Sequence, residues 1–116
     1  MSAVVVLLTT LPPELAPTVV ETLVREGVIA CGNIVPAVQS IYVWQGELCR
    51  DTEALVICET AAASRDAALA RLRALHPYEC PKLIAIDPAA VGDDYLRWAV
   101  AATTRGAQPD GSDAPR

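Results

Sequence analysis

Phenylalanine is absent from this chain, and aromatic residues account for only 4% of its 116 residues. Because hydrophobic residues nevertheless reach 53%, valine, leucine, isoleucine and alanine must fill the core. A chain of this length and apolar content is typical of one domain rather than two. The two tryptophans and three tyrosines therefore stand out as positions with a specific role.

Positive charge is scarce as well, because nine lysines and arginines stand against fourteen acids and give a net charge of −5. Nucleic acids and anionic membrane surfaces bind basic patches, so we expect neither as a partner. No apolar run approaches the roughly 20 residues needed to cross a bilayer. The first residues also lack the basic start and long apolar core of a signal peptide, and we therefore expect a cytoplasmic protein.

No CxxC pair occurs among the four cysteines, so the sequence predicts neither a zinc ribbon nor a thioredoxin-type dithiol. In a reducing cytoplasm we expect free thiols. For each of them, a role as a small buried hydrophobic side chain is the alternative to a ligand or redox role. They are Cys31, Cys49, Cys58 and Cys80.

Strand-like and helix-like patterns alternate along the chain. Thr9 or Thr10 is placed to cap a first helix of about 13 residues, which Gly27 ends. Ser64 is placed to cap a second helix, which His76-Pro77 stops. The predicted strands cover residues 4–8, 28–44, 47–60 and 82–86.

These elements follow the order β-α-β-β-α-β with an extra C-terminal helix, which is the ferredoxin-like split βαβ arrangement. The predicted fold class is α+β, with an antiparallel sheet that carries two helices on one face. We place a single domain at residues 1–104. The last segment, 105–116, is rich in Gly, Pro, Asp and Ser, and we expect it to be a disordered tail.

The two middle strands form one long hairpin that turns at Gln45-Gly46. Each of its strands has about 12 residues and spans about 40 Å, whereas a domain of this size has a radius of gyration of about 13 Å. The hairpin must therefore overhang its own domain. Its outer part lacks polar alternation, so we expect another copy of the chain to cover it. A bent hairpin that folds back on its own helices is the alternative.

Pro36 lies within the first strand of this hairpin, where a proline indicates a sheet edge or a bulge. Without a bulge, Cys58 faces Asn33, and Cys31 is a diagonal neighbour of Cys58 on the same face. Such neighbours lie roughly 7 Å apart and can share a soft ion after small shifts. A bulge at Pro36 changes that register.

The only histidine lies in the segment His76-Pro77-Tyr78-Glu79-Cys80-Pro81, where two prolines stiffen the backbone around reactive side chains. A neutral imidazole binds copper or zinc, and a thiolate adds affinity for soft metals. His76 and Cys31 are therefore the candidate metal ligands. The alternative for His76 is an interaction with the carbonyl groups at the end of its helix.

Three segments resemble the hallmarks of the CutA divalent-cation-tolerance family. They run from Ala30 to Gly46, from His76 to Pro81 and from Asp94 to Trp98, within an overall resemblance over residues 4–104. The resemblance implies a homotrimer of ferredoxin-like subunits, similar in architecture to PII-type signalling proteins. It also implies a link to tolerance of copper and other divalent cations, which some members bind, and no accepted catalytic reaction.

The resemblance further implies a cleft between subunits. The residues that match its polar and aromatic set are Trp44, Glu53, Tyr78, Glu79, Tyr95 and Trp98. Pairing of the acids with arginines across subunit contacts is the competing interpretation. The chain departs from the family pattern at Glu59, where members often carry lysine. It also has Leu8 and Leu75 where some members carry a proposed copper-binding cysteine and histidine.

The sequence therefore predicts a homotrimeric CutA-like protein that binds Cu(II) or another divalent cation and takes part in a metal response. The alternative is a PII-like signalling or scaffold trimer whose intersubunit cleft binds a small molecule, with metal incidental. We do not expect an enzyme, because the chain contains no phosphate-binding loop, dinucleotide fingerprint or recognisable nucleophile and base pair.

Overall fold

The computed structural model of the chain describes residues 2–104, so the predicted tail at 105–116 lies outside the described residues. The sheet has the strand order β2-β3-β1-β4, and every neighbouring pair is antiparallel. This order confirms the predicted ferredoxin-like α+β fold with an extra C-terminal helix. The elements are β1 (Val4–Leu11), α1 (Ala16–Arg25), β2 (Cys31–Trp44), β3 (Glu47–Ala61), a short 3-10 turn (Ala62–Ser64), α2 (Arg65–Leu75), β4 (Ile84–Ile86) and α3 (Asp93–Thr104).

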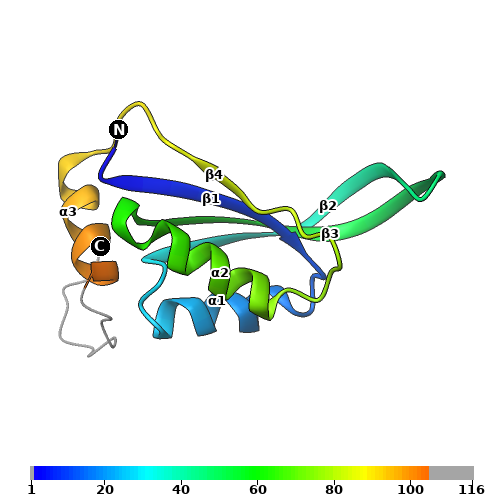
Figure 1. Ribbon diagram of the computed structural model, residues 1–116, viewed down its shortest axis with the longest axis horizontal. Coiled ribbons are helices and arrows are strands. Elements are labelled where there is room, and N and C mark those ends of the chain that lie inside the picture. The colour runs from blue at the N-terminus through cyan, green and yellow to red at the C-terminus, as the bar shows by residue number, and fades with distance from the viewer. Residues whose placement is uncertain (1, 105–116) are drawn as a thin grey trace.

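Two helices, α1 and α2, cover one face of the sheet, and α3 packs at one end of the other face (Figure 1). The core between the sheet and the two helices consists of aliphatic side chains and one cysteine. Its most deeply buried large members are Leu7, Leu11, Leu23, Ile29, Val56, Cys58 and Leu72. Within residues 2–104, no helix combines the length and apolar character needed to cross a bilayer.

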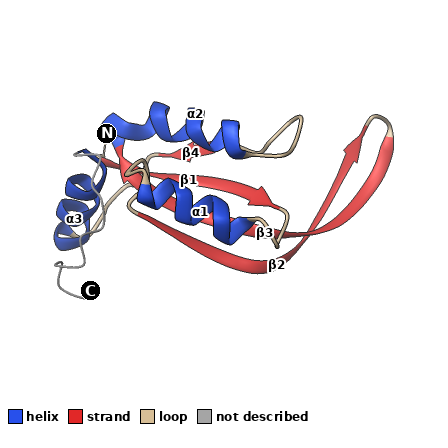
Figure 2. Ribbon diagram, turned by 90° about the horizontal axis from the view of Figure 1, so that it is seen from below, coloured by secondary structure: helices blue, strands red, loops and turns tan. Residues whose placement is uncertain are grey.

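The β2–β3 hairpin extends well beyond the rest of the sheet. Its turn has positive φ angles at Gln45 (51°) and Gly46 (83°), as a two-residue hairpin turn of type I′ requires. Because β1 pairs with β3 only from Ala54 onward, residues 38–53 form a two-stranded projection, which we call the arm. The molecule accordingly measures 48 × 29 × 22 Å, and Figure 2 shows the arm curving away from the sheet. The predicted overhang is confirmed.

A bulge at Pro36 and Ala37 shifts the register of the hairpin by one residue. Cys58 therefore faces Gly32 instead of Asn33. Side chains alternate between the two faces of a strand, so Cys31 and Cys58 lie on opposite faces. The prediction that these two cysteines can share a soft ion assumed a register without a bulge, and it is wrong for this chain.

The start of α1 also differs from the prediction. Thr9 and Thr10 do not cap a helix but continue β1, where they pair with Val56 and Leu55 of β3. Their β-branched side chains favour the strand, and this preference outweighs their capping ability. The helix begins only at Ala16 and has 10 residues. Its end agrees with the prediction, because Gly27 has the positive φ of 73° typical of a helix-terminating glycine.

Ser64 precedes α2 as predicted, but its hydroxyl does not cap that helix. It donates a hydrogen bond of 2.6 Å to the backbone carbonyl of Thr103 in α3. The hydroxyl of Thr103 in turn accepts a hydrogen bond of 2.9 Å from the backbone N–H of Ala61. These contacts fix the end of α3 against the junction between β3 and α2.

Gly32 provides a test of the packing between α1 and the sheet. A Cβ atom at this position would lie 2.6 Å from Cγ1 of Val20, too close for the β-branched side chain to accommodate. We expect Gly32→Ala to lower the free energy of unfolding by about 1–3 kcal/mol, as overpacking in a core does. Gly92→Ala is the control, because a Cβ there meets nothing within 4 Å. Denaturant unfolding of both variants at one protein concentration measures the difference, and equal stability would contradict the tight fit.

Candidate functional site

The structure distributes the predicted site residues over three places in one chain. Trp44 lies at the tip of the arm, next to the turn. Glu53, His76 and Tyr78 meet where the arm joins the sheet, and we call them the arm-base cluster. Tyr95 and Trp98 lie on α3, which packs near the other end of the paired part of β3. A cleft that contains all of them therefore needs more than one chain.

His76 is held by hydrogen bonds at both ring nitrogens. Its Nε2 lies 2.8 Å from the carbonyl oxygen of Thr10, and its Nδ1 accepts the backbone N–H of Tyr78 at 3.2 Å. This pattern requires the tautomer with hydrogen on Nε2. The ring is only 8% exposed, and this burial lowers its pKa from the ordinary value of about 6.5. His76 is therefore a neutral side chain bonded to a carbonyl of β1, not to those at the end of its own helix.

Glu53 places a carboxylate in a buried position at the base of the arm. The residue is 7% exposed, and its Oε2 accepts a hydrogen bond of 2.7 Å from the hydroxyl of Tyr78. Burial raises the pKa of Tyr78, and the hydrogen bond to Glu53 raises it further, so the phenol stays protonated. The Tyr78 ring lies against His76 with ring centres 4.7 Å apart. Glu79, the next residue, is exposed.

A second polar cluster lies at the opposite end of the paired part of β3, and we call it the α3 cluster. Cys31 of β2 and Glu59 of β3 are direct cross-strand partners, and the hydroxyl of Tyr95 donates to Glu59 Oε1 at 2.7 Å. Asn33 joins them, since its Oδ1 lies 4.0 Å from Sγ of Cys31. Burial, followed by the interactions with Glu59 and then with Cys31, raises the pKa of Tyr95. The ring of Trp98 lies against that of Tyr95, with ring centres 5.6 Å apart and ring planes inclined by 38°.

The two predicted metal ligands do not meet within one chain. His76 lies in the cluster that contains Glu53, whereas Cys31 pairs with Glu59, and positions 53 and 59 of β3 are about 20 Å apart along the strand. Within residues 2–104, no three side chains of His, Cys, Asp or Glu are placed to hold a metal ion together. Metal binding by His76 and Cys31 stays a prediction, and the two side chains cannot bind the same ion within one chain.

The remaining cysteines differ in their exposure. Cys58 is buried, and this burial raises the pKa of its thiol to about 12. Cys49 is half-buried on the arm and Cys80 is exposed, and all four cysteines are free. Cys58 is therefore a hydrophobic core residue, and it is a poor source of the thiolate that metals and electrophiles require.

Two arginines, Arg71 and Arg97, pair with acids other than Glu53 and Glu59. Arg71 makes a two-pronged ion pair with Glu26 at 2.7 and 2.8 Å, and it thereby joins α2 to the end of α1. Arg97 pairs with Asp94 on its own helix at 2.7 Å. Inside one chain, the carboxylates of Glu53 and Glu59 therefore receive tyrosine hydroxyls instead of guanidinium groups.

One contact near the candidate cleft was not predicted. The hydroxyl of Tyr42 donates a hydrogen bond to Asp51 across the arm, and this bond raises the pKa of Tyr42 to about 12. The register of the hairpin contains the signal for it, because Ser40 faces Asp51 and Tyr42 is therefore a diagonal neighbour of Asp51 on the same face.

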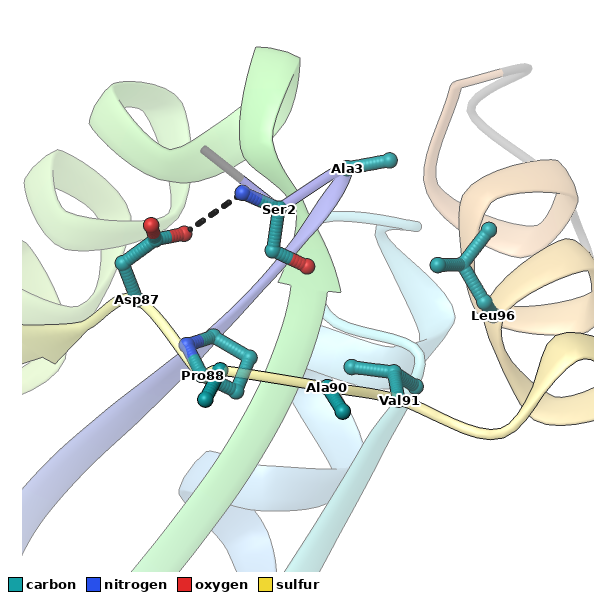
Figure 3. Close-up of a pocket in the computed structure, with 8 residues that line it drawn as sticks. Ser2, Ala3, Asp87, Pro88, Ala90, Val91 and Leu96 are labelled. Atoms are coloured by element: carbon teal, nitrogen blue, oxygen red, sulfur yellow. Dashed lines mark hydrogen bonds between the residues drawn. The ribbon is translucent and has the colours of Figure 1, made fainter.

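A shallow depression of about 500 Å³ lies beside α3 and contains no residue of either cluster (Figure 3). It is bounded by the start of β1, the segment 87–91 and Leu96 of α3. Its carboxylate, on Asp87, accepts the backbone N–H of Ser2 at 2.9 Å. None of the predicted site residues lines it, and its other side chains are Ser, Ala, Pro, Val and Leu, so it offers little chemistry.

Comparisons with known proteins agree on one family. The family model described as CutA1 divalent ion tolerance protein matches residues 4–102. The divalent-cation tolerance protein CutA of Thermus thermophilus is 42% identical over 94 residues, which cover 81% of this chain and 91% of that protein.

Solved structures show the same relationship. The divalent ion tolerance protein CutA1 from Ehrlichia chaffeensis has a TM-score of 0.84 at 33% identity, covering 90% of this chain and 98% of that one. The PII-like protein CutA from a Nostoc species, in apo form, has a TM-score of 0.82 at 32% identity, covering 85% of this chain and 96% of that one.

The burial of His76 leads to a pH-dependent stability. Because the pKa of His76 is lower in the folded protein, the unfolded chain binds the proton more tightly. The contribution of His76 to the free energy of unfolding is therefore fully present above about pH 6.5 and decreases as the pH drops below that value. As the only histidine, His76 gives one imidazole signal in NMR, whose titration midpoint we expect below about 6.5. The neighbouring Glu53 acts in the opposite direction but is the smaller influence. A midpoint at or above the ordinary value would contradict the dominance of burial.

Proposed function

Because the chain belongs to the CutA1 divalent ion tolerance family, we propose that it is a homotrimeric divalent-cation tolerance protein that binds copper or another divalent cation. In this role it acts in a metal response by binding, not by catalysis. The observation that carries the proposal is an apolar sheet face that, within residues 2–104, a helix covers only at one end.

The helix-free face is the side of the sheet opposite α1 and α2, beyond the end that α3 covers. Its apolar side chains come from all four strands, and several are well exposed in one chain, among them Ile84 (44%), Ile86 (43%) and Val35 (40%). The members are Val6, Leu8, Val35, Leu55, Ile57, Ile84 and Ile86. A contiguous apolar surface of this kind marks a contact with another protein surface.

The arm adds a second exposed apolar surface. Its large hydrophobic residues near the turn are Ile41, Tyr42, Val43, Trp44 and Leu48, all between 41% and 67% exposed. Because the arm projects past its own domain, it reaches a neighbouring subunit more readily than its own helices. A closed ring in which each arm lies on the next subunit covers both the arms and the helix-free faces. The number three in this ring comes from the family resemblance.

Binding rather than catalysis is supported by the state of the polar groups. His76 has both ring nitrogens engaged in hydrogen bonds, and Tyr78 is held in its neutral form. Neither is poised for proton transfer near neutral pH. The relatives are named as tolerance proteins and not as enzymes. We also propose a cytoplasmic location, where the four free cysteines stay reduced.

A metal ion in the proposed trimer needs ligands from more than one source. His76 supplies an imidazole only if its hydrogen bond to Thr10 or Tyr78 is given up, while Cys31 is a half-buried thiol. Within residues 2–104, neither side chain forms a metal-binding group with two further His, Cys, Asp or Glu side chains. We therefore place metal binding where a neighbouring chain or solvent completes the coordination.

One observation favours a second candidate function, a PII-like trimer that binds a small molecule. Glu53 presents a buried carboxylate beside Tyr78 at the base of the arm, where an adjoining subunit would form a cleft. Trp44, Glu79, Tyr95 and Trp98 would add aromatic and polar walls from more than one chain. The relative from Nostoc carries the description PII-like, which fits this alternative. In that case bound metal is incidental.

Light scattering tests the assembly. We expect a mass of three chains of 12.3 kDa each for the full-length protein. Ile86→Glu should lower this mass, because it places a charge in the covered face while the isolated chain exposes that position. Ala67→Glu on the exposed side of α2 is the matched control and should leave the mass unchanged. A wild-type monomer would overturn the proposed assembly.

Metal titration separates the two candidate functions. We expect the trimer to bind Cu(II) or Zn(II) with an affinity that His76→Ala or Cys31→Ser lowers at least about tenfold. Calorimetry measures the affinity, with Cys80→Ser as the control for a thiol that takes no part in binding. Circular dichroism checks that each variant is folded. If all four proteins bind both cations weakly and alike, specific metal binding is excluded and the small-molecule function is favoured.

A further inference from the structure

The α3 cluster brings together side chains that are chemically suited to a divalent cation. The bulge at Pro36 and Ala37 makes Cys31 and Glu59 direct cross-strand partners on one face of the sheet. The Cβ atoms of such partners lie about 4.5–5.5 Å apart, so a thiol and a carboxylate face the same small volume. Both residues are half-buried, which limits their exposure to competing water.

Asn33 adds a third donor at a suitable distance. It lies on the same face as Cys31, two positions along β2, and its Oδ1 is 4.0 Å from Sγ of Cys31. In a tetrahedral zinc site, sulfur at about 2.3 Å and oxygen at about 2.1 Å from the metal are about 3.6 Å from each other. The observed separation therefore needs only a small side-chain adjustment to admit an ion.

Glu59 has one carboxylate oxygen occupied and no positive partner. Its Oε1 accepts the hydroxyl of Tyr95 at 2.7 Å, and no second donor to its carboxylate lies within residues 2–104. None of the four ion pairs within the same residues includes Glu59. Tyr95 thus orients the carboxylate in the way that outer hydrogen bonds orient metal ligands, which makes it a positioning residue.

We propose that Cys31, Asn33 and Glu59 form a site for a thiol-seeking divalent cation of the Zn²⁺ or Cd²⁺ class at the border of the helix-free face. The soft sulfur donor selects such ions over Mg²⁺ and Ca²⁺, and the two oxygen donors complete a three-ligand set. On binding, the thiol of Cys31 forms a sulfur–metal bond and releases its proton to solvent. Water or a group from a neighbouring chain takes the fourth position.

This site differs from one built on His76. It lies at the other end of the paired part of β3, about 20 Å from Glu53 and its neighbours. The proposed site specifies which residues of one chain hold the ion, and its assignment to a divalent cation rests on the proposed function. Covering of the helix-free face by another subunit would enclose the ion and tighten its binding, because water competes less there.

Cadmium titration of the reduced full-length protein tests the site. Cd²⁺ bound to a thiolate gives a charge-transfer absorption in the ultraviolet, which reports sulfur ligation directly. We expect one thiolate-bound ion for each chain, loss of the absorption in Cys31→Ser, and an affinity of this ion at least about tenfold lower in Glu59→Gln. Tyr95→Phe keeps the ring and removes the hydroxyl, so it should weaken binding while the absorption remains. Cys80→Ser should match the wild type in both measurements.

The outcomes separate this site from the broader proposal. If the wild type binds Cd²⁺ and the absorption persists in Cys31→Ser, or if Glu59→Gln binds as the wild type does, this ligand set is wrong while metal binding stands. If the wild type binds no Cd²⁺, Zn²⁺ or Cu²⁺, both the site and the proposed metal function are overturned. Light scattering on each variant shows whether a loss of binding comes from a loss of assembly.

Discussion

The alternation of side chains along β3 is the constraint on which the rest of the structure depends. This strand pairs with both β1 and β2, so each of its residues is committed to one face of the sheet. Val56 and Cys58 point into the core under α1 and α2. Leu55 and Ile57 point the opposite way, and each has one apolar cross-strand partner, Val35 for Leu55 and Leu8 for Ile57. A strand that is apolar on both faces requires cover on both, and the helices of one chain cover one face fully but only one end of the other.

The same alternation places a carboxylate at each end of the helix-free face. Glu53 and Glu59 share the face of Leu55 and Ile57, and each accepts a tyrosine hydroxyl at 2.7 Å. The two ends nevertheless differ in chemistry. The arm-base carboxylate is buried beside a neutral imidazole, whereas the α3 carboxylate lies beside a thiol and an amide oxygen. An apolar face bordered by two unlike polar groups can combine assembly at its centre with ligand binding at its edges.

Local sequence signals predicted the elements well and long-range contacts poorly. The glycines at 27 and 46 indicated the helix end and the hairpin turn because positive φ is a property of single residues. The partner of His76 is a carbonyl 66 residues away, and no periodicity encodes it. The prediction that Thr10 caps a helix was wrong for the same reason, because pairing with a distant residue on β3 determines its conformation. The three places of the candidate cleft depend on register, which one bulge at Pro36 shifts by one residue.

The bulge also separates the hairpin into two parts whose lengths can change independently. Between Val38↔Glu53 and Trp44↔Glu47 the pairing is regular, so two residues added to each strand would leave every side chain on its present face. Such an insertion lengthens the arm by about 7 Å without moving the sheet beneath the helices. A single added residue would instead reverse the faces of the arm. The length by which the arm extends toward a neighbouring subunit can therefore change by insertion or deletion, but only by two residues in each strand at a time.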